Sequence, residues 1–213
     1  MKKVLKAVDI STLFHLHHFN HNEKEFTEVM IDYNENNIHK TEPIKAYAPK
    51  KYSLFTTTLN VGEASLQSIV GEIKDWIVQG HDVYAIGVQE CIDLNGLRDA
   101  ILNHLGGPTK YTMYTAAIGS GNTRLGYHGY IALTVFVKTS ELLAGNIHPT
   151  STTSKTMATG TDLIITTAQN KGAVGIPLQI HDTSIGFVTC HLPSDSKGKS
   201  KLVKRNASAH AIL

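Results

Sequence analysis

Five polar residues stand where apolar runs begin or end, and their types suit metal-assisted chemistry on a phosphate. They are Asn60, Glu90, Asn170, Lys171 and His191. A carboxylate with amide oxygens offers the hard ligands that Mg²⁺ prefers. A lysine adds a point charge, and a histidine adds an N–H donor, for the oxygens of a phosphate group. If strand ends bring these residues together, the hypothesis is metal-assisted attack on a phosphate ester.

Each of these residues also has a plainer interpretation when it is taken alone. Glu90 is then the polar stop of a buried strand, and Asn60 an ordinary turn residue. Lys171 is a solvated hairpin charge, and His191 an edge histidine whose ring is satisfied locally. Their joint occurrence at strand ends makes a shared site as good an interpretation as the plain ones, because functional groups gather on loops and at the ends of elements.

The elements that must position these residues begin at Tyr52. Residues 52–61 are β-branched and aromatic, which predicts a strand. Residues 63–80 place apolar side chains on one helical face, with Gly80 as a helix stop. Residues 82–90 form an apolar run that ends in Glu90. The order strand, helix, strand predicts a βαβ-like unit.

The rest of the chain alternates one more helix with a series of strands. A helix is expected over residues 94–107 and another over the basic C-terminal stretch, residues 197–213. Strands are expected between and after them, over residues 111–118, 130–138, 162–169, 172–180 and 184–192. The class is therefore α+β, with largely antiparallel strands and helices on the outside.

Composition and charge bound the function. The chain has 213 residues, of which 41% are hydrophobic and 18% charged, which is typical of a globular protein. The net charge of +2 argues against a general nucleic-acid binder. Lys6 and Asp9 interrupt any signal-peptide core, so we expect a cytoplasmic protein whose Cys91 and Cys190 stay reduced.

Five stretches in a fixed order resemble the inositol polyphosphate 5-phosphatase catalytic domain of the DNase I-like endonuclease/exonuclease/phosphatase superfamily. "TTLNVGEA" is similar to its Asn-containing strand end, with Leu59 where Trp is usual. "DVYAIGVQE" and "GYIALTVFVK" are similar to two of its core strands. "TAQNKGAVGI" resembles its Gly-Asn-Lys-Gly-Ala-Val motif, and "FVTCHLPSDSKGKSKLVKRNASAHAI" its His-Leu motif and the helix that follows.

The resemblance implies a DNase I-like two-sheet β-sandwich flanked by helices. It implies Mg²⁺-dependent removal of the 5-phosphate from inositol polyphosphates or phosphoinositides. Carried over by position, Glu90 and Asn60 would hold the metal, and Asn60 would also support the phosphate. His191 would stabilise the scissile phosphate, and His191 and Asn60 would be the catalytic residues. Substrate phosphates would be bound by Asn170, Lys171 and Arg205.

The chain also departs from the family. The Gly-Asp-Leu-Asn motif, whose residues activate the attacking water, is not found, and neither is Pro-x-Trp-Cys-Asp-Arg. We therefore expect residues 52–213 to form a partial, apparently truncated catalytic domain with little activity alone. Two alternatives stay open: a non-catalytic phosphoinositide-binding remnant and an endonuclease of the same superfamily.

Two segments flank or extend this expected domain. Residues 1–51 are polar, with weak periodicity, and are expected to form an N-terminal extension. The C-terminal stretch carries a basic run: Lys197, Lys199, Lys201, Lys204 and Arg205. This run predicts either peripheral contact with anionic membranes or a solvated helix face near a phosphate site.

Overall fold

The computed structural model describes residues 50–125, 128–150, 155–158, 171–195 and 200–212. Residues 1–49, which hold nearly all of the expected N-terminal extension, lie outside the described residues. The boundary between residues 51 and 52 therefore stays a prediction. The expected strand over residues 162–169 also lies outside the described part of the chain.

The first sheet, sheet A, has four strands in the order β1-β2-β4-β3. Their bounds are β1 Leu54–Asn60, β2 Val83–Cys91, β3 Tyr111–Ser120 and β4 Gly129–Lys138. β1 runs parallel to β2, whereas β2 and β3 each pair antiparallel with β4. The parallel pair with a helical connection confirms the predicted βαβ-like unit.

The helical connection itself differs from the prediction of one helix over residues 63–80. The chain forms two short helices, α1 Leu66–Val70 and α2 Ile73–Trp76. Gly71 ends α1, and the Glu72 N–H bonds back to the Ile69 carbonyl, three residues earlier. Glycine weakens a helix interior by about 1 kcal/mol relative to alanine, so a break in the helix at this position costs little free energy.

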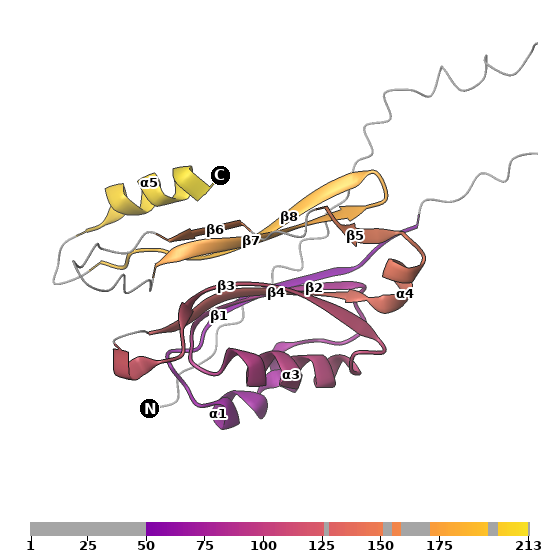
Figure 1. Cartoon of the computed structure of the whole chain (residues 1–213), viewed down its shortest axis with the longest axis horizontal. Coiled ribbons are helices and arrows are strands. Elements are labelled where there is room, and N and C mark those ends of the chain that lie inside the picture. Colours follow the sequence, from indigo (N-terminus) through magenta and orange to yellow (C-terminus); the bar gives the residue numbers. More distant parts are fainter. Residues whose placement is uncertain (1–49, 126–127, 151–154, 159–170, 196–199, 213) are drawn as a thin grey trace, which may run out of the picture. The chain divides into compact units, whose positions relative to one another are not determined.

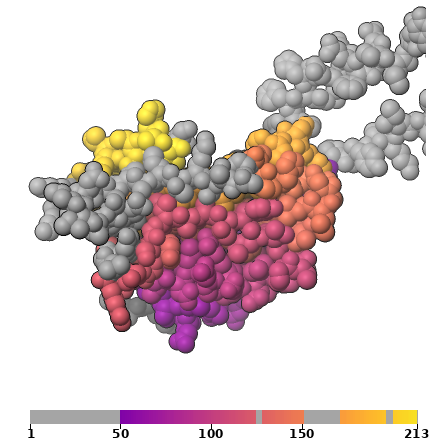
Figure 2. All heavy atoms as spheres, in the orientation of Figure 1, coloured from indigo at the N-terminus to yellow at the C-terminus, as the bar shows by residue number. Residues whose placement is uncertain are grey.

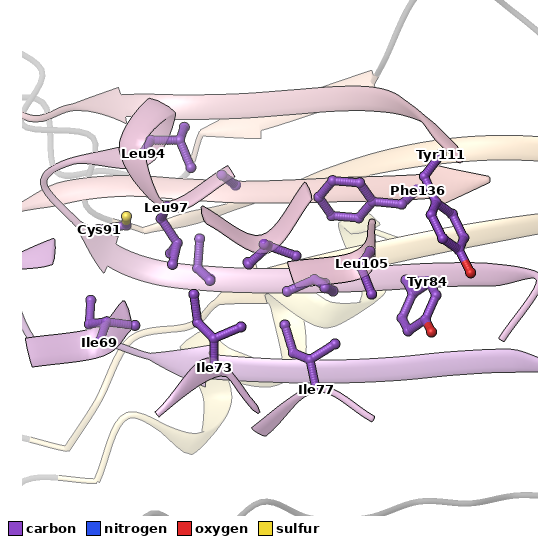
Figure 3. Close-up of a cluster of buried hydrophobic side chains, with 14 residues drawn as sticks. Ile69, Ile73, Ile77, Tyr84, Cys91, Leu94, Leu97, Leu105, Tyr111 and Phe136 are labelled. Carbon is purple, nitrogen blue, oxygen red and sulfur yellow. The ribbon is translucent and has the colours of Figure 1, made fainter. Parts of the chain in front are cut away.

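Helix α3, Leu94–Leu105, completes the layer that covers one face of sheet A. Its N-terminus is capped by Asp93, whose side chain accepts a hydrogen bond from the Gly96 N–H. Figure 3 shows the apolar cluster between this layer and the sheet, which includes Ile69, Ile73, Leu97 and Phe136. In the space-filling view (Figure 2), the atoms of this layer (violet to magenta) form the outer surface on that side of the sheet.

The second sheet, sheet B, is built around one long strand. Its strands are β5 Ile147–Pro149, β6 Lys155–Ala158, β7 Gly172–Ile180 and β8 Thr183–His191. β7 pairs antiparallel with β8 over its whole length, and with β5 and β6 over its two ends. The two long strands were expected from the sequence at residues 172–180 and 184–192.

The two sheets pack face to face, with sheet A between sheet B and the helical layer (Figure 1). The buried residues between them are mainly aliphatic, such as Val135 from β4, and Val174 and Leu178 from β7. Three further elements are α4 Thr139–Leu143, the 3₁₀ turn η1 Thr123–Leu125, and α5 Leu202–Ile212. None of the helices in the described ranges is long and apolar enough to cross a membrane.

Candidate active site

Glu90 lies in a β-bulge near the end of β2. The register with β4 shifts between Val88 and Cys91, so that Gln89 and Glu90 together oppose the single residue Ile131. Glu90 has φ of +55°, a left-handed conformation that is uncommon for a residue with a side chain. Bulges and strained backbone of this kind often re-aim a side chain at a functional site.

Gly129 on the facing strand makes this bulge possible. Its own φ is +81°, and a Cβ at this position would lie 2.6 Å from the backbone carbonyl carbon of Glu90. Real side chains do not approach a backbone atom so closely. The close passage of β4 against the bulge therefore requires glycine at residue 129.

The bulge changes the side of the sheet to which the Glu90 side chain belongs. Tyr84, Ile86 and Val88 face the helical layer, so strict alternation would place residue 90 there as well. Instead, the extra residue puts Cys91 on the helical side. The Glu90 carboxylate Oε1 then lies 3.7 Å from the His191 Nε2 of sheet B.

The imidazole of His191 and the charged Lys171 complete a polar cluster around Glu90. Gly172, which follows Lys171, is the cross-strand partner of His191. Burial lowers the pKa of His191, the Lys171 charge lowers it further, and the Glu90 charge opposes both. Burial also lowers the pKa of Lys171, again against the charge of Glu90. The His191 imidazole is therefore neutral at pH 7 and presents one N–H donor.

Asn60 lies beside the bulge, at the end of the neighbouring strand β1. It is the parallel partner of Gln89. The residues after it bond to the bulge through the backbone, because the Val61 and Glu63 N–H groups donate to the carbonyls of Gln89 and Glu90. The Asn60 Oδ1 accepts from the Gly62 N–H at 2.9 Å, which shapes this turn. The second lone pair of Oδ1 remains the one that a metal ion could use.

Arg205, one of the two remaining predicted site residues, has its contacts outside this cluster. Arg205, in α5, donates to the Pro193 carbonyl at 3.1 Å and pairs with the Asp195 carboxylate. Its predicted contact with substrate stays a prediction. Asn170 lies outside the described residues. The charge of Lys201, just before α5, lowers the pKa of Lys171. The start of this helix therefore lies within electrostatic range of the cluster.

Sequence reasoning missed Gln89, a buried residue that links the two sheets next to Glu90. Its Nε2 donates to the Thr58 Oγ1 at 2.9 Å and to the Thr189 Oγ1 at 3.0 Å. Strand alternation could have indicated it, because an odd-numbered amide in β2 points into the sandwich beside Val83 and Ala85. Sequence reasoning also missed the pair of His128 and Glu63, with 2.7 Å between Nδ1 and Oε1.

Comparison with known proteins identifies the family of this chain. Residues 57–213 match the model of Endonuclease/Exonuclease/phosphatase family 2. The chain is 31% identical over 179 residues to phosphatidylinositol 3,4,5-trisphosphate 5-phosphatase 2B of Danio rerio, an alignment that covers 76% of this chain and 13% of that protein.

The fold has a solved counterpart, the inositol polyphosphate 5-phosphatase domain of SPsynaptojanin in complex with inositol (1,4)-bisphosphate and a calcium ion. The TM-score is 0.51 at 20% identity, over 75% of this chain and 44% of that one. The predicted fold class and resemblance are confirmed, and the chain spans less than half of either relative. This protein belongs to Endonuclease/Exonuclease/phosphatase family 2 and carries part of the two-sheet fold of an inositol polyphosphate 5-phosphatase domain.

Proposed function

We propose that this chain binds inositol polyphosphates or phosphoinositides at the Glu90–Lys171–His191 cluster, as a Mg²⁺-dependent phosphoric monoester hydrolase directed at the 5-phosphate. The observation that carries the proposal is the 3.7 Å approach of the Glu90 carboxylate to the His191 imidazole, with Lys171 beside them. The sequence relative is named as a 5-phosphatase, and the structural relative holds an inositol bisphosphate and a calcium ion.

The donor set fits a hydrated divalent ion. Among the described residues, no three His, Cys, Asp or Glu side chains gather into a closed metal cage. Mg²⁺ does not need such a cage, since it usually keeps several waters and binds through one or two carboxylates plus substrate phosphates. Glu90 would hold it, with the Asn60 amide oxygen next to it. When bound, the ion supplies Lewis-acid polarisation of a phosphoryl oxygen.

The chain's own residues would bind and orient the phosphate. Lys171 places a positive charge next to the site, in a partly buried position where charge interactions are stronger than in water. The neutral His191 imidazole donates an N–H to a phosphate oxygen, and donors of this kind stabilise charge that develops in the transition state. Asn170 and Arg205 are proposed as further phosphate contacts.

The test measures binding and turnover on the full chain. With Mg²⁺ present, we expect inositol 1,4,5-trisphosphate to bind in titration calorimetry. Lys171→Ala should weaken this binding roughly tenfold or more, because a partly buried charge-assisted contact is lost. The matched control is Lys74→Ala, which removes an exposed lysine of α2 from the opposite side of sheet A.

Phosphate release from the same ligand separates the alternatives. Turnover supports the hydrolase, and tight binding without turnover supports the non-catalytic binding module. Cleavage of DNA without phosphate release would favour the endonuclease. The proposal fails if the wild-type chain does not bind the ligand, or if the two lysine variants behave alike.

We also propose that the substrate is met at a cytoplasmic membrane surface. Lys201 and Lys204 flank two apolar residues at the start of α5, Leu202 and Val203, which are 54% and 83% exposed. Basic residues next to exposed apolar ones favour an anionic lipid interface. Binding to phosphoinositide vesicles should fall as salt rises. Vesicle binding that is absent or insensitive to salt would remove this proposal and leave soluble inositol phosphates as ligands.

A further inference from the structure

Gln89 forms a polar bridge between the two sheets in a mainly apolar interior. Its Nε2 donates both of its hydrogens, to Thr58 of β1 and to Thr189 of β8, at 2.9 and 3.0 Å. Gln89 is 6% exposed and Thr189 is 5% exposed. Buried polar groups that are paired in this way have narrow distance and angle requirements, which apolar contacts lack.

The bridge lies next to the Glu90–His191 contact on both strands. Gln89 immediately precedes Glu90, and Thr189 lies two residues before His191, on the same face of β8. Because neighbouring positions on a strand move together, a change in the bridge should change how closely the carboxylate approaches the imidazole.

Gly87 is a second, independent feature that sets the spacing at this point. A Cβ on Gly87 would lie 2.4 Å from the Thr189 Oγ1 and 2.8 Å from its Cβ. β8 therefore reaches this depth over β2 only because residue 87 has no side chain. The glycine permits the close approach, and the Gln89 amide fixes where along β2 the Thr189 hydroxyl is held.

We propose that Gln89 and Thr189 are positioning residues, which hold Glu90 and His191 at the separation that a metal-bound phosphate requires. Both residues are buried and bonded to each other, so their effect on a ligand would pass through the cluster. This inference rests on the proposed function for its effect on ligand binding. The effect of the bridge on the distance between Glu90 and His191 can be measured without any ligand.

The main variant is Thr189→Val, which keeps the shape of the side chain and removes the hydroxyl. Thr189→Ser restores the hydroxyl and is the conservative rescue. Ile176→Val is the matched control, because it trims a buried side chain of the same sandwich, on β7, without touching the bridge. Thr58→Ala, at the exposed end of the bridge, is a milder variant if Thr189→Val does not fold.

Two readouts decide the proposal. The first is the binding of inositol 1,4,5-trisphosphate with Mg²⁺, which Thr189→Val should weaken roughly tenfold, the effect of losing about 1.4 kcal/mol of binding free energy when the charged contacts are misaligned. Thr189→Ser and Ile176→Val should stay within about threefold of wild type, although Ile176→Val lowers the melting temperature. The affinity of Thr58→Ala should lie between that of Thr189→Val and those of the two mild variants.

The second readout is the nuclear Overhauser effect between the His191 ring protons and the Glu90 methylene protons, in the absence of ligand. It should be present in wild type and in Thr189→Ser, and weakened in Thr189→Val and Thr58→Ala. If the wild type shows this pattern but does not bind the ligand, the proposed function fails and the positioning role stands. If Thr189→Val only loses stability, with an unchanged Overhauser effect and affinity, the bridge is merely structural and the inference is overturned.

Discussion

The two ends of strand β2 each present a carboxylate, and they differ in how fully the protein satisfies it. Asp82, just before the strand, accepts hydrogen bonds from the Ser53 N–H and Oγ, both at 2.8 Å, and from the Lys138 Nζ at 2.7 Å. The Glu90 carboxylate instead lies 3.7 Å from the Nε2 of the neutral His191, which is longer than a hydrogen bond. A carboxylate at a strand end is thus open to a ligand only where protein donors do not already fill it.

The backbone of β2 is regular at the Asp82 end and irregular at the Glu90 end. At the Asp82 end, β2 and β4 are in regular register from Val83 and Val137 onward, and the Lys138 N–H donates to the Asp82 carbonyl. At the Glu90 end, the register shifts and the residue takes a positive φ. Within β2 itself, the strained backbone is thus at the end with the open carboxylate, and strain of this kind is often found where proteins bind or catalyse.

Gly129→Ala should have the largest effect on the free energy of unfolding, because the added methyl group lies directly against the bulge. A Cβ that meets the Glu90 backbone at a positive φ should destabilise the fold by about 2–4 kcal/mol. Urea denaturation of the full chain measures the change. Gly71→Ala is the control, since that glycine has open space around it and no positive φ. Equal stability of the two variants would show that the bulge does not depend on Gly129.

Asp82→Asn should have a smaller but clear effect at the satisfied end. Losing charge-assisted hydrogen bonds from Lys138 and Ser53 should destabilise the fold by about 1.5–3 kcal/mol at neutral pH. The affinity for inositol phosphate should not change, because Asp82 lies at the opposite end of β2 from the cluster. A loss of affinity equal to that of Lys171→Ala would break the distinction between the two ends.

The same carboxylate predicts a pH dependence of stability. Burial raises the pKa of Asp82, but the hydrogen bonds from Lys138 and Ser53 outweigh it and lower the pKa below the usual 3.8. A depressed pKa in the folded state adds stability above the unfolded value, and this stability is lost as pH falls through the folded pKa. The stability difference between wild type and Asp82→Asn should therefore shrink as the pH falls below about 4.

Much of this arrangement could be predicted from the sequence, because strand ends are local features. The apolar runs located β2, which carries Glu90, and β8, which carries His191. The family motifs pointed to Lys171. The bulge could not be predicted, because it depends on Gly129, which is distant in sequence and meets Glu90 only after β4 pairs with β2. The same applies to Gln89, whose partner Thr189 is 100 residues away. The break at Gly71 was visible locally but was outweighed by the regular spacing of Ile69, Ile73 and Ile77.

Glu90→Gln should have the smallest effect on stability and a large effect on binding. The neutral His191 gives the Glu90 charge little ion-pair stabilisation, and the side chain remains 31% exposed. The free energy of unfolding should therefore change by no more than about 0.5 kcal/mol. The Mg²⁺-dependent part of inositol phosphate affinity should be lost, because a neutral amide is a much weaker metal ligand than a carboxylate.

Together with Asp82→Asn, this variant forms a crossed test of the two ends of β2. The carboxylate that the protein satisfies should matter for stability and not for binding, and the open carboxylate should show the reverse. The control for Glu90→Gln is Asp99→Asn, at an exposed position of α3. Neither the free energy of unfolding nor the ligand affinity should change in this variant. If Glu90→Gln destabilises the chain as much as Asp82→Asn does and leaves affinity intact, Glu90 is a structural carboxylate. The bulge would then need an explanation other than ligand binding.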